Sequence, residues 1–75
     1  MSVKHLILTS AKSYIGKAIN IHLLDGSVIV NVCLESIEDK AFLKCRLPDR
    51  SIKRVLLHDV VWVESVSPYL CLGVN

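Results

Sequence analysis

The sequence lacks most features that mark secreted, metal-binding or membrane-spanning proteins. Its three cysteines are an odd number, with no C-x-x-C pair and no histidine at a ligand spacing, which predicts neither a disulfide framework nor a zinc site. Cys33 and Cys45 lie in apolar strand patterns and are expected to be buried thiols. The chain has no run of about 18 uncharged apolar residues, and the apolar residues 6–8 that follow Lys4 and His5 are too few for the core of a signal peptide. We therefore expect a cytoplasmic protein with no membrane segment.

Catalytic signatures are missing as well. The chain has no Ser-His-Asp arrangement and no glycine-rich phosphate loop, and a solvated turn explains the acidic cluster of Glu35, Glu38 and Asp39. We expect no enzyme, no cofactor and no bound metal. Apolar side chains, by contrast, are abundant, because 52% of the 75 residues are hydrophobic. A domain this small cannot bury so much apolar surface alone, so the composition predicts self-association.

Alternating apolar and polar residues predict a mostly β fold. Asp25-Gly26 predicts a type I′ turn after the first strand. The expected strands are residues 18–24, 27–37, 41–47, 52–57 and 60–66. The side chains expected to point into the core are those of Ile19, Ile21, Leu23, Val30, Val32, Leu43 and Val63.

Five short, bent antiparallel strands can bury a core by curling into a small barrel. We expect an SH3-like barrel at about residues 17–66, with a short amphipathic helix before it at about 3–13 and an apolar tail after it at 67–75. All of these belong to a single domain, residues 1–75. An OB-fold is disfavoured because no helix fits between Leu47 and Ile52.

Three segments resemble motifs of the Sm-like (LSm) family, which includes the bacterial host-factor RNA chaperones. Residues 16–26 (GKAINIHLLDG) resemble Gly-Lys-x-Val-x-Val-x-Leu-x-Asp/Asn-Gly, and residues 34–38 (LESIE) resemble Ile/Leu-Glu-Ser-Phe/Ile-Asp. Residues 57–63 (LHDVVWV) can be laid on the chaperones' Lys-His-Ala-Ile-Ser-Thr-Val, with His58 at the histidine. The resemblance spans residues 15–64. It implies an Sm-like barrel, a homo-oligomeric ring of about five to seven subunits and binding of single-stranded RNA.

The chain departs from these motifs at several positions. The family's glycine in the second strand is absent, with Asn31 or Val32 in its place, and one residue is inserted between Gly26 and Leu34. The family's RNA-contacting positions hold different residues here, namely Glu38, Lys40, Phe42 and Leu57. The resemblance therefore implies the fold more directly than it implies uridine recognition.

Basic residues are concentrated in one stretch. Six of the nine lie between residues 40 and 54, against a single acid, Asp49. Cations around an aromatic ring are typical of a surface that binds single-stranded nucleic acid. The alternative interpretation is a solvated edge hairpin, on which lysines discourage edge-to-edge aggregation. His58 either contacts a base or satisfies a backbone carbonyl. The candidate RNA-binding residues are Lys40, Phe42, Lys44, Arg46, Arg54 and His58.

The last two strands, residues 52–57 and 60–66, are apolar on both faces. One face serves the core, so the other must be covered by another subunit. The candidate interface residues are Ile52, Leu56, Leu57, Val61, Trp62 and Val63. Two functions remain open: a ring that binds single-stranded RNA, and a structural or protein-interaction ring that has lost RNA recognition.

Overall fold

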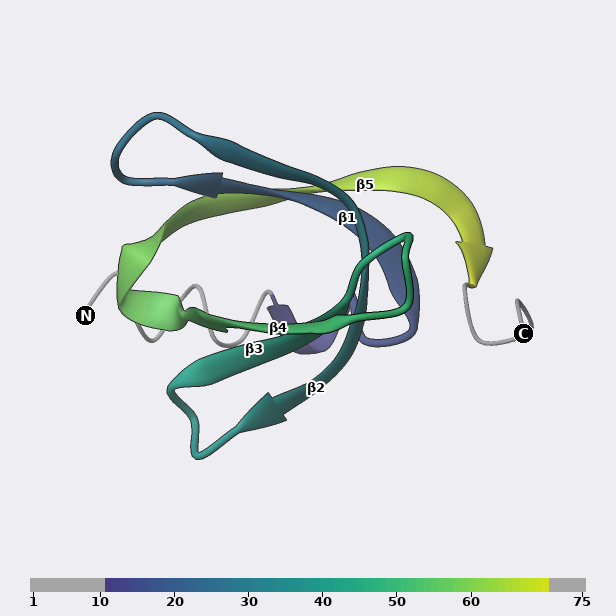
Figure 1. Cartoon of the computed structure of the whole chain (residues 1–75), viewed down its shortest axis with the longest axis horizontal. Helices are drawn as coiled ribbons and strands as arrows, with labels where there is room; N and C mark the ends of the chain where they lie inside the picture. The colour runs from purple at the N-terminus through teal and green to yellow at the C-terminus, as the bar shows by residue number, and fades with distance from the viewer. Residues whose placement is uncertain (1–10, 71–75) are drawn as a thin grey trace.

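The computed structural model describes residues 11–70, and their side chains as far as residue 66. These residues form one antiparallel sheet with the strand order β4-β3-β2-β1-β5 (Figure 1). The elements are β1 (Lys17–Leu23), β2 (Val28–Glu38), β3 (Phe42–Arg46), β4 (Ile52–Leu56), the 3-10 turn η1 (Leu57–Asp59) and β5 (Val60–Leu70). The predicted mostly β fold with five antiparallel strands is confirmed. No helix in this part of the chain is long and apolar enough to cross a membrane.

The predicted end segments differ from the structure in part. Residues 3–10 of the expected helix lie outside the described part of the chain, and Ala11 and Lys12 have helical backbone. Residues 67–70 of the expected tail belong to β5, which continues to Leu70. The remaining residues of that tail, 71–75, also lie outside the described part.

β2 connects the two halves of the bent sheet. Figure 1 shows it passing from the half that it forms with β1 and β5 to the half that it forms with β3 and β4. Ile19 pairs with Val32 and Ile21 with Ile29, so β2 carries one residue more than β1 between these pairs. Asn31 lies in this bulge with a φ of 55°, a left-handed conformation that asparagine tolerates better than most residues.

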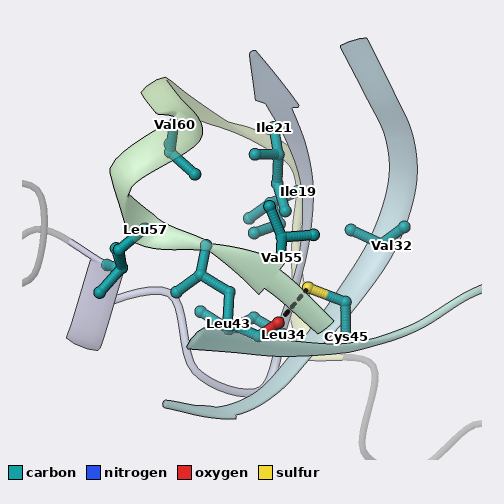
Figure 2. Packing of buried hydrophobic residues seen from close by; sticks show 10 residues of the cluster. Ile19, Ile21, Val32, Leu34, Leu43, Cys45, Val55, Leu57 and Val60 are labelled. Carbon is teal, nitrogen blue, oxygen red and sulfur yellow. Dashed lines mark hydrogen bonds between the residues drawn. The ribbon is translucent and has the colours of Figure 1, made fainter. Parts of the chain in front are cut away.

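The core lies between the two halves of the sheet (Figure 2). Leu23 and Val63 are partly buried against it, as expected. Four of the predicted core residues, Ile19, Ile21, Val32 and Leu43, are fully buried. The buried cluster consists of Ala11, Ile19, Ile21, Val32, Leu34, Leu43, Cys45, Val55, Leu57 and Val60.

Two predicted orientations are wrong. Val30 was expected in the core but is 61% exposed, because the bulge at the following residue changes the face to which the strand's side chains point. Leu57 was expected at a subunit interface but is fully buried. β4 ends at Leu56, and η1 turns Leu57 into the core while its N–H donates to the Ala41 carbonyl at 2.8 Å.

The loop between β1 and β2 is not the predicted type I′ turn. Gly26 has a φ of 89°, but the φ of Asp25 is not positive. The Gly26 N–H donates to the Leu23 carbonyl, and the Leu23 N–H donates to the Ser27 carbonyl. Gly26, whose backbone is left-handed, therefore comes after the two central residues of the turn, as in a three-residue hairpin loop with a glycine bulge.

The cysteines also differ from the prediction. Cys33 is disulfide-bonded, so its expected state as a thiol is wrong. Cys45 is a buried free thiol as predicted. Burial, with a smaller effect of the Glu35 charge, raises the pKa of Cys45 to about 11.

Candidate nucleic-acid interface

Two loops meet at one end of the sheet and bring Lys40 and His58 to the same side of the molecule. Asp39 and Lys40 have φ values of 52° and 53° and form a type I′ turn closed by the Ala41 N–H donating to the Glu38 carbonyl at 2.9 Å. The hydrogen bond from Leu57 to Ala41 ties η1 to this turn. The structure therefore unites two candidate RNA-binding residues that are far apart in the sequence, and both are exposed.

The outer face of β3 carries the next candidates. Leu43 and Cys45 are buried, so Phe42, Lys44 and Arg46 alternate on the opposite face. Phe42 lies opposite Leu56, and Lys44 lies opposite Arg54. An aromatic ring and three cations thus share one surface of β3 and β4, as the sequence predicted.

Glutamates from β2 neutralise part of this surface. Arg46 Nη2 lies 2.6 Å from Glu35 Oε2, and Arg54 Nε donates to Glu38 Oε1 at 2.7 Å. The hydrogen bond from Arg54 holds the pKa of Glu38 below its ordinary value. Lys44 makes no ion pair within the described residues. The sequence count over residues 40–54 did not include Glu35 and Glu38, because these acids lie on the neighbouring strand β2.

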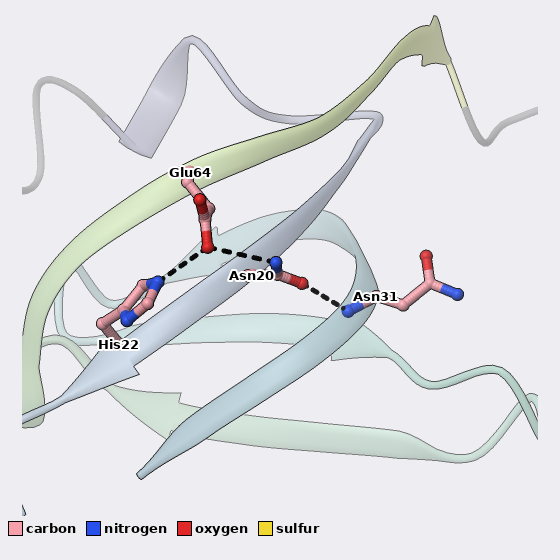
Figure 3. Close-up of polar contacts among 4 residues, drawn as sticks. All are labelled: Asn20, His22, Asn31 and Glu64. Carbon is pink, nitrogen blue, oxygen red and sulfur yellow. Dashed lines mark hydrogen bonds and ion pairs between the residues drawn. The ribbon is translucent and has the colours of Figure 1, made fainter. Parts of the chain in front are cut away.

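A second polar cluster lies on the other half of the sheet, and the sequence did not predict it (Figure 3). His22 Nε2 and Glu64 Oε1 are 2.8 Å apart, and Asn20 Nδ2 donates to the same oxygen at 3.1 Å. Asn20 Oδ1 accepts the Asn31 N–H at 2.8 Å, which links β5, β1 and β2. The hydrogen bonds from His22 and then Asn20 lower the pKa of Glu64.

Trp62 completes this second cluster. Its ring stacks on His22 with a centroid separation of 3.9 Å and an interplanar angle of 9°, since Trp62 lies opposite His22 in the β1–β5 register. Asn20 and His22 alternate with Ile19, Ile21 and Leu23, which were expected in the core, so the sequence pattern implies an outward face for both. It could not show which β5 residues lie opposite them.

The predicted interface residues separate into two groups. Ile52, Leu56, Val61 and Trp62 are exposed on the two edge strands, as an interface requires. Val63 is half-buried against the core, because it pairs with the buried Ile21. Together with Leu57, it belongs to the interior of the subunit.

The described residues contain no group of three or more histidine, cysteine or acidic side chains that could hold a metal ion. Comparison of the chain with protein-family models, curated proteins and solved structures finds no match. The chemistry of the surface therefore rests on the residues themselves: a turn with an exposed lysine, an exposed histidine on the adjoining 3-10 turn, and an aromatic ring on the same face as partly neutralised cations.

Proposed function

We propose that the protein is a divergent Sm-like module that assembles into a closed homo-oligomeric ring and binds single-stranded RNA. The strand order, with β4 and β5 at opposite edges and a 3-10 turn between them, supports this family. The bulge in β2 absorbs the residue inserted relative to the family motif, and Asn31 adopts the left-handed conformation that a glycine would favour.

The two edge strands carry the ring proposal. Within residues 11–70, β4 borders only β3, and β5 borders only β1. Each edge exposes large apolar side chains, between 40% and 49% exposed: Ile52 and Leu56 on β4, and Val61, Trp62 and Val66 on β5. Such edges pair with another chain. Because the two edges belong to different strands, the contact is head-to-tail, and it forms a ring if the rotation closes.

Light scattering with size-exclusion chromatography tests the ring. We expect an oligomer at micromolar concentration and a monomer for Val61→Asp, which places a charge on the β5 edge. Val30→Asp is the matched control, because Val30 is equally apolar and even more exposed but lies on the central strand β2. A monomeric parent protein, or equal effects of the two variants, contradicts the ring.

Four side chains support RNA binding: Lys40, Phe42, Lys44 and His58. Residues other than glycine that adopt the left-handed conformation cluster at functional sites. Asp39 and Lys40 are two such residues, next to each other in one turn. An exposed lysine and histidine at one end, with Phe42 and Lys44 on the adjoining strand, can contact phosphates and stack a base. The ion pairs at Arg46 and Arg54 favour the second candidate, a ring that binds protein and not RNA.

Binding titrations with oligouridine and oligoadenine at several salt concentrations separate these two functions. If the protein binds RNA, Lys44→Ala reduces the slope of log affinity against log salt by about 0.7, and Phe42→Ala removes about 1–3 kcal/mol of stacking. Arg50→Ala removes the same charge in the β3–β4 turn, at the far end of β3, and leaves binding unchanged. Absence of binding at low salt supports the protein-binding ring.

A further inference from the structure

The outward-facing residues of the two edge strands form complementary patterns. On β4, Val55 is buried, so Ile52, Arg54 and Leu56 share the outer face. On β5, Ser65 lies opposite the buried Ile19, so the alternate residues Trp62, Glu64 and Val66 share the outer face. Each row is a charged residue between two apolar ones, with opposite signs of charge on the two edges.

We propose that these rows recognise each other between copies of the chain and set the register of the subunit contact. β4 of one copy lies antiparallel to β5 of the next, like every other neighbouring pair in the sheet. The register places Arg54 opposite Glu64, Leu56 opposite Trp62, and Ile52 opposite Val66. This inference rests on the proposed ring and adds the residues that specify it.

The two charged side chains are already held in place within each subunit. Arg54 donates through Nε to Glu38, and its two terminal amino groups make no hydrogen bond to another described residue, so they can reach a partner. Both hydrogen bonds that Glu64 accepts within the described part of the chain reach Oε1, so Oε2 can face the partner. The Arg54 side chain is 54% exposed and that of Glu64 is 40% exposed. Ordering before contact lowers the entropic cost of forming the pair.

Trp62 is also held in position, because its ring stacks on His22. Its indole can therefore meet Leu56 of the next subunit as an aromatic–aliphatic cross-strand pair. A slip of two residues along the edge sets Arg54 opposite Trp62 or Val66, and Glu64 opposite Ile52 or Leu56. Both charges then lose their partner, and this penalty selects the proposed register.

Charge reversal at the paired positions tests the register. We expect Arg54→Glu and Glu64→Arg each to raise the concentration needed for assembly by about 10-fold or more, since like charges then face each other. Mixing the two variants restores assembly, because every junction again joins opposite charges. The mixed ring alternates the two chains, so native mass spectrometry shows an even number of subunits. Lys53→Glu makes the same charge change on the opposite face of β4, where Lys53 lies opposite the buried Cys45, and leaves assembly intact.

A second measurement covers the case in which a reversed variant fails to fold. Ile52→Cys combined with Val66→Cys forms disulfide-linked oligomers on mild oxidation, whereas the off-register combination of Leu56→Cys with Val66→Cys does not. If the parent protein is a monomer, the ring fails and the register with it. If the parent protein forms a ring but the reversals leave assembly unchanged, or the off-register cysteines cross-link equally, the register is wrong and the ring stands.

Discussion

Relief of the strained β2–β3 turn should separate stability from RNA binding. Asp39 and Lys40 have φ values of 52° and 53°, where a side chain costs roughly 1–2 kcal/mol. Glycine removes this cost but loses about 0.5–1 kcal/mol in chain entropy. Lys40→Gly and Asp39→Gly should therefore each stabilise the fold by about 0.5–1 kcal/mol, or about 2–8 °C in Tm for a domain of this size. Aspartate tolerates the conformation better than lysine, so Lys40→Gly should gain more.

RNA binding should respond differently to the two substitutions. Lys40→Gly removes a cation from the proposed site, so oligouridine affinity and its salt dependence should both fall. Asp39→Gly relieves the same turn, keeps the lysine and leaves binding equal or tighter. Calorimetry at fixed protein concentration and anisotropy titrations measure the two quantities. A loss of stability in both variants refutes the strain argument, and equal RNA affinity of Lys40→Gly and the parent removes Lys40 from the site.

Three further predictions concern the core, the ionised side chains and the disulfide. Ile21→Ala empties a fully buried position and should cost about 2–5 kcal/mol, so a melting temperature close to that of the parent contradicts the core assignment. The lowered pKa values of Glu38 and Glu64, caused first by hydrogen bonds from Arg54 and His22, predict a stabilisation that is complete above the ordinary value of 4.5. This stabilisation is lost as the pH falls through the lowered pKa values of the folded state. In urea unfolding, the free energy of unfolding of the double variant Glu38→Gln, Glu64→Gln should therefore change less with pH in the acid range than that of the parent. Cys33→Ser should lower the melting temperature under non-reducing conditions and have little effect in dithiothreitol; an unchanged melting temperature without reductant argues against a stabilising disulfide.

The sequence predicted the strands well because their side-chain period is set by burial of one face. Ile19 and Ile21 alternate with polar residues, and both are fully buried in the structure. The period failed at Val30, where one extra residue in β2 reverses the faces. The alternation of apolar and polar residues does not reveal such a bulge, because the bulge is defined by the length of one strand relative to the strand that pairs with it.

The candidate site was predicted in part. The sequence identified Lys40 and His58, and the structure places them on adjoining loops. It could not predict that Glu38 would neutralise Arg54 or that Trp62 would lie on His22. These contacts depend on which residues of neighbouring strands lie opposite each other, and register is a property of pairs of strands and not of either one.

The stack between Trp62 and His22 makes the protein's own fluorescence a local probe. Trp62 is the single tryptophan of the chain, so all indole emission comes from the boundary between β1 and β5. Separation of that stack changes the emission at one place, whereas circular dichroism follows the whole sheet. Coincident thermal transitions in the two signals indicate that the β1–β5 boundary opens only with the rest of the fold. An earlier transition in the emission shows that β5 separates first and that this edge is the least stable part of the subunit.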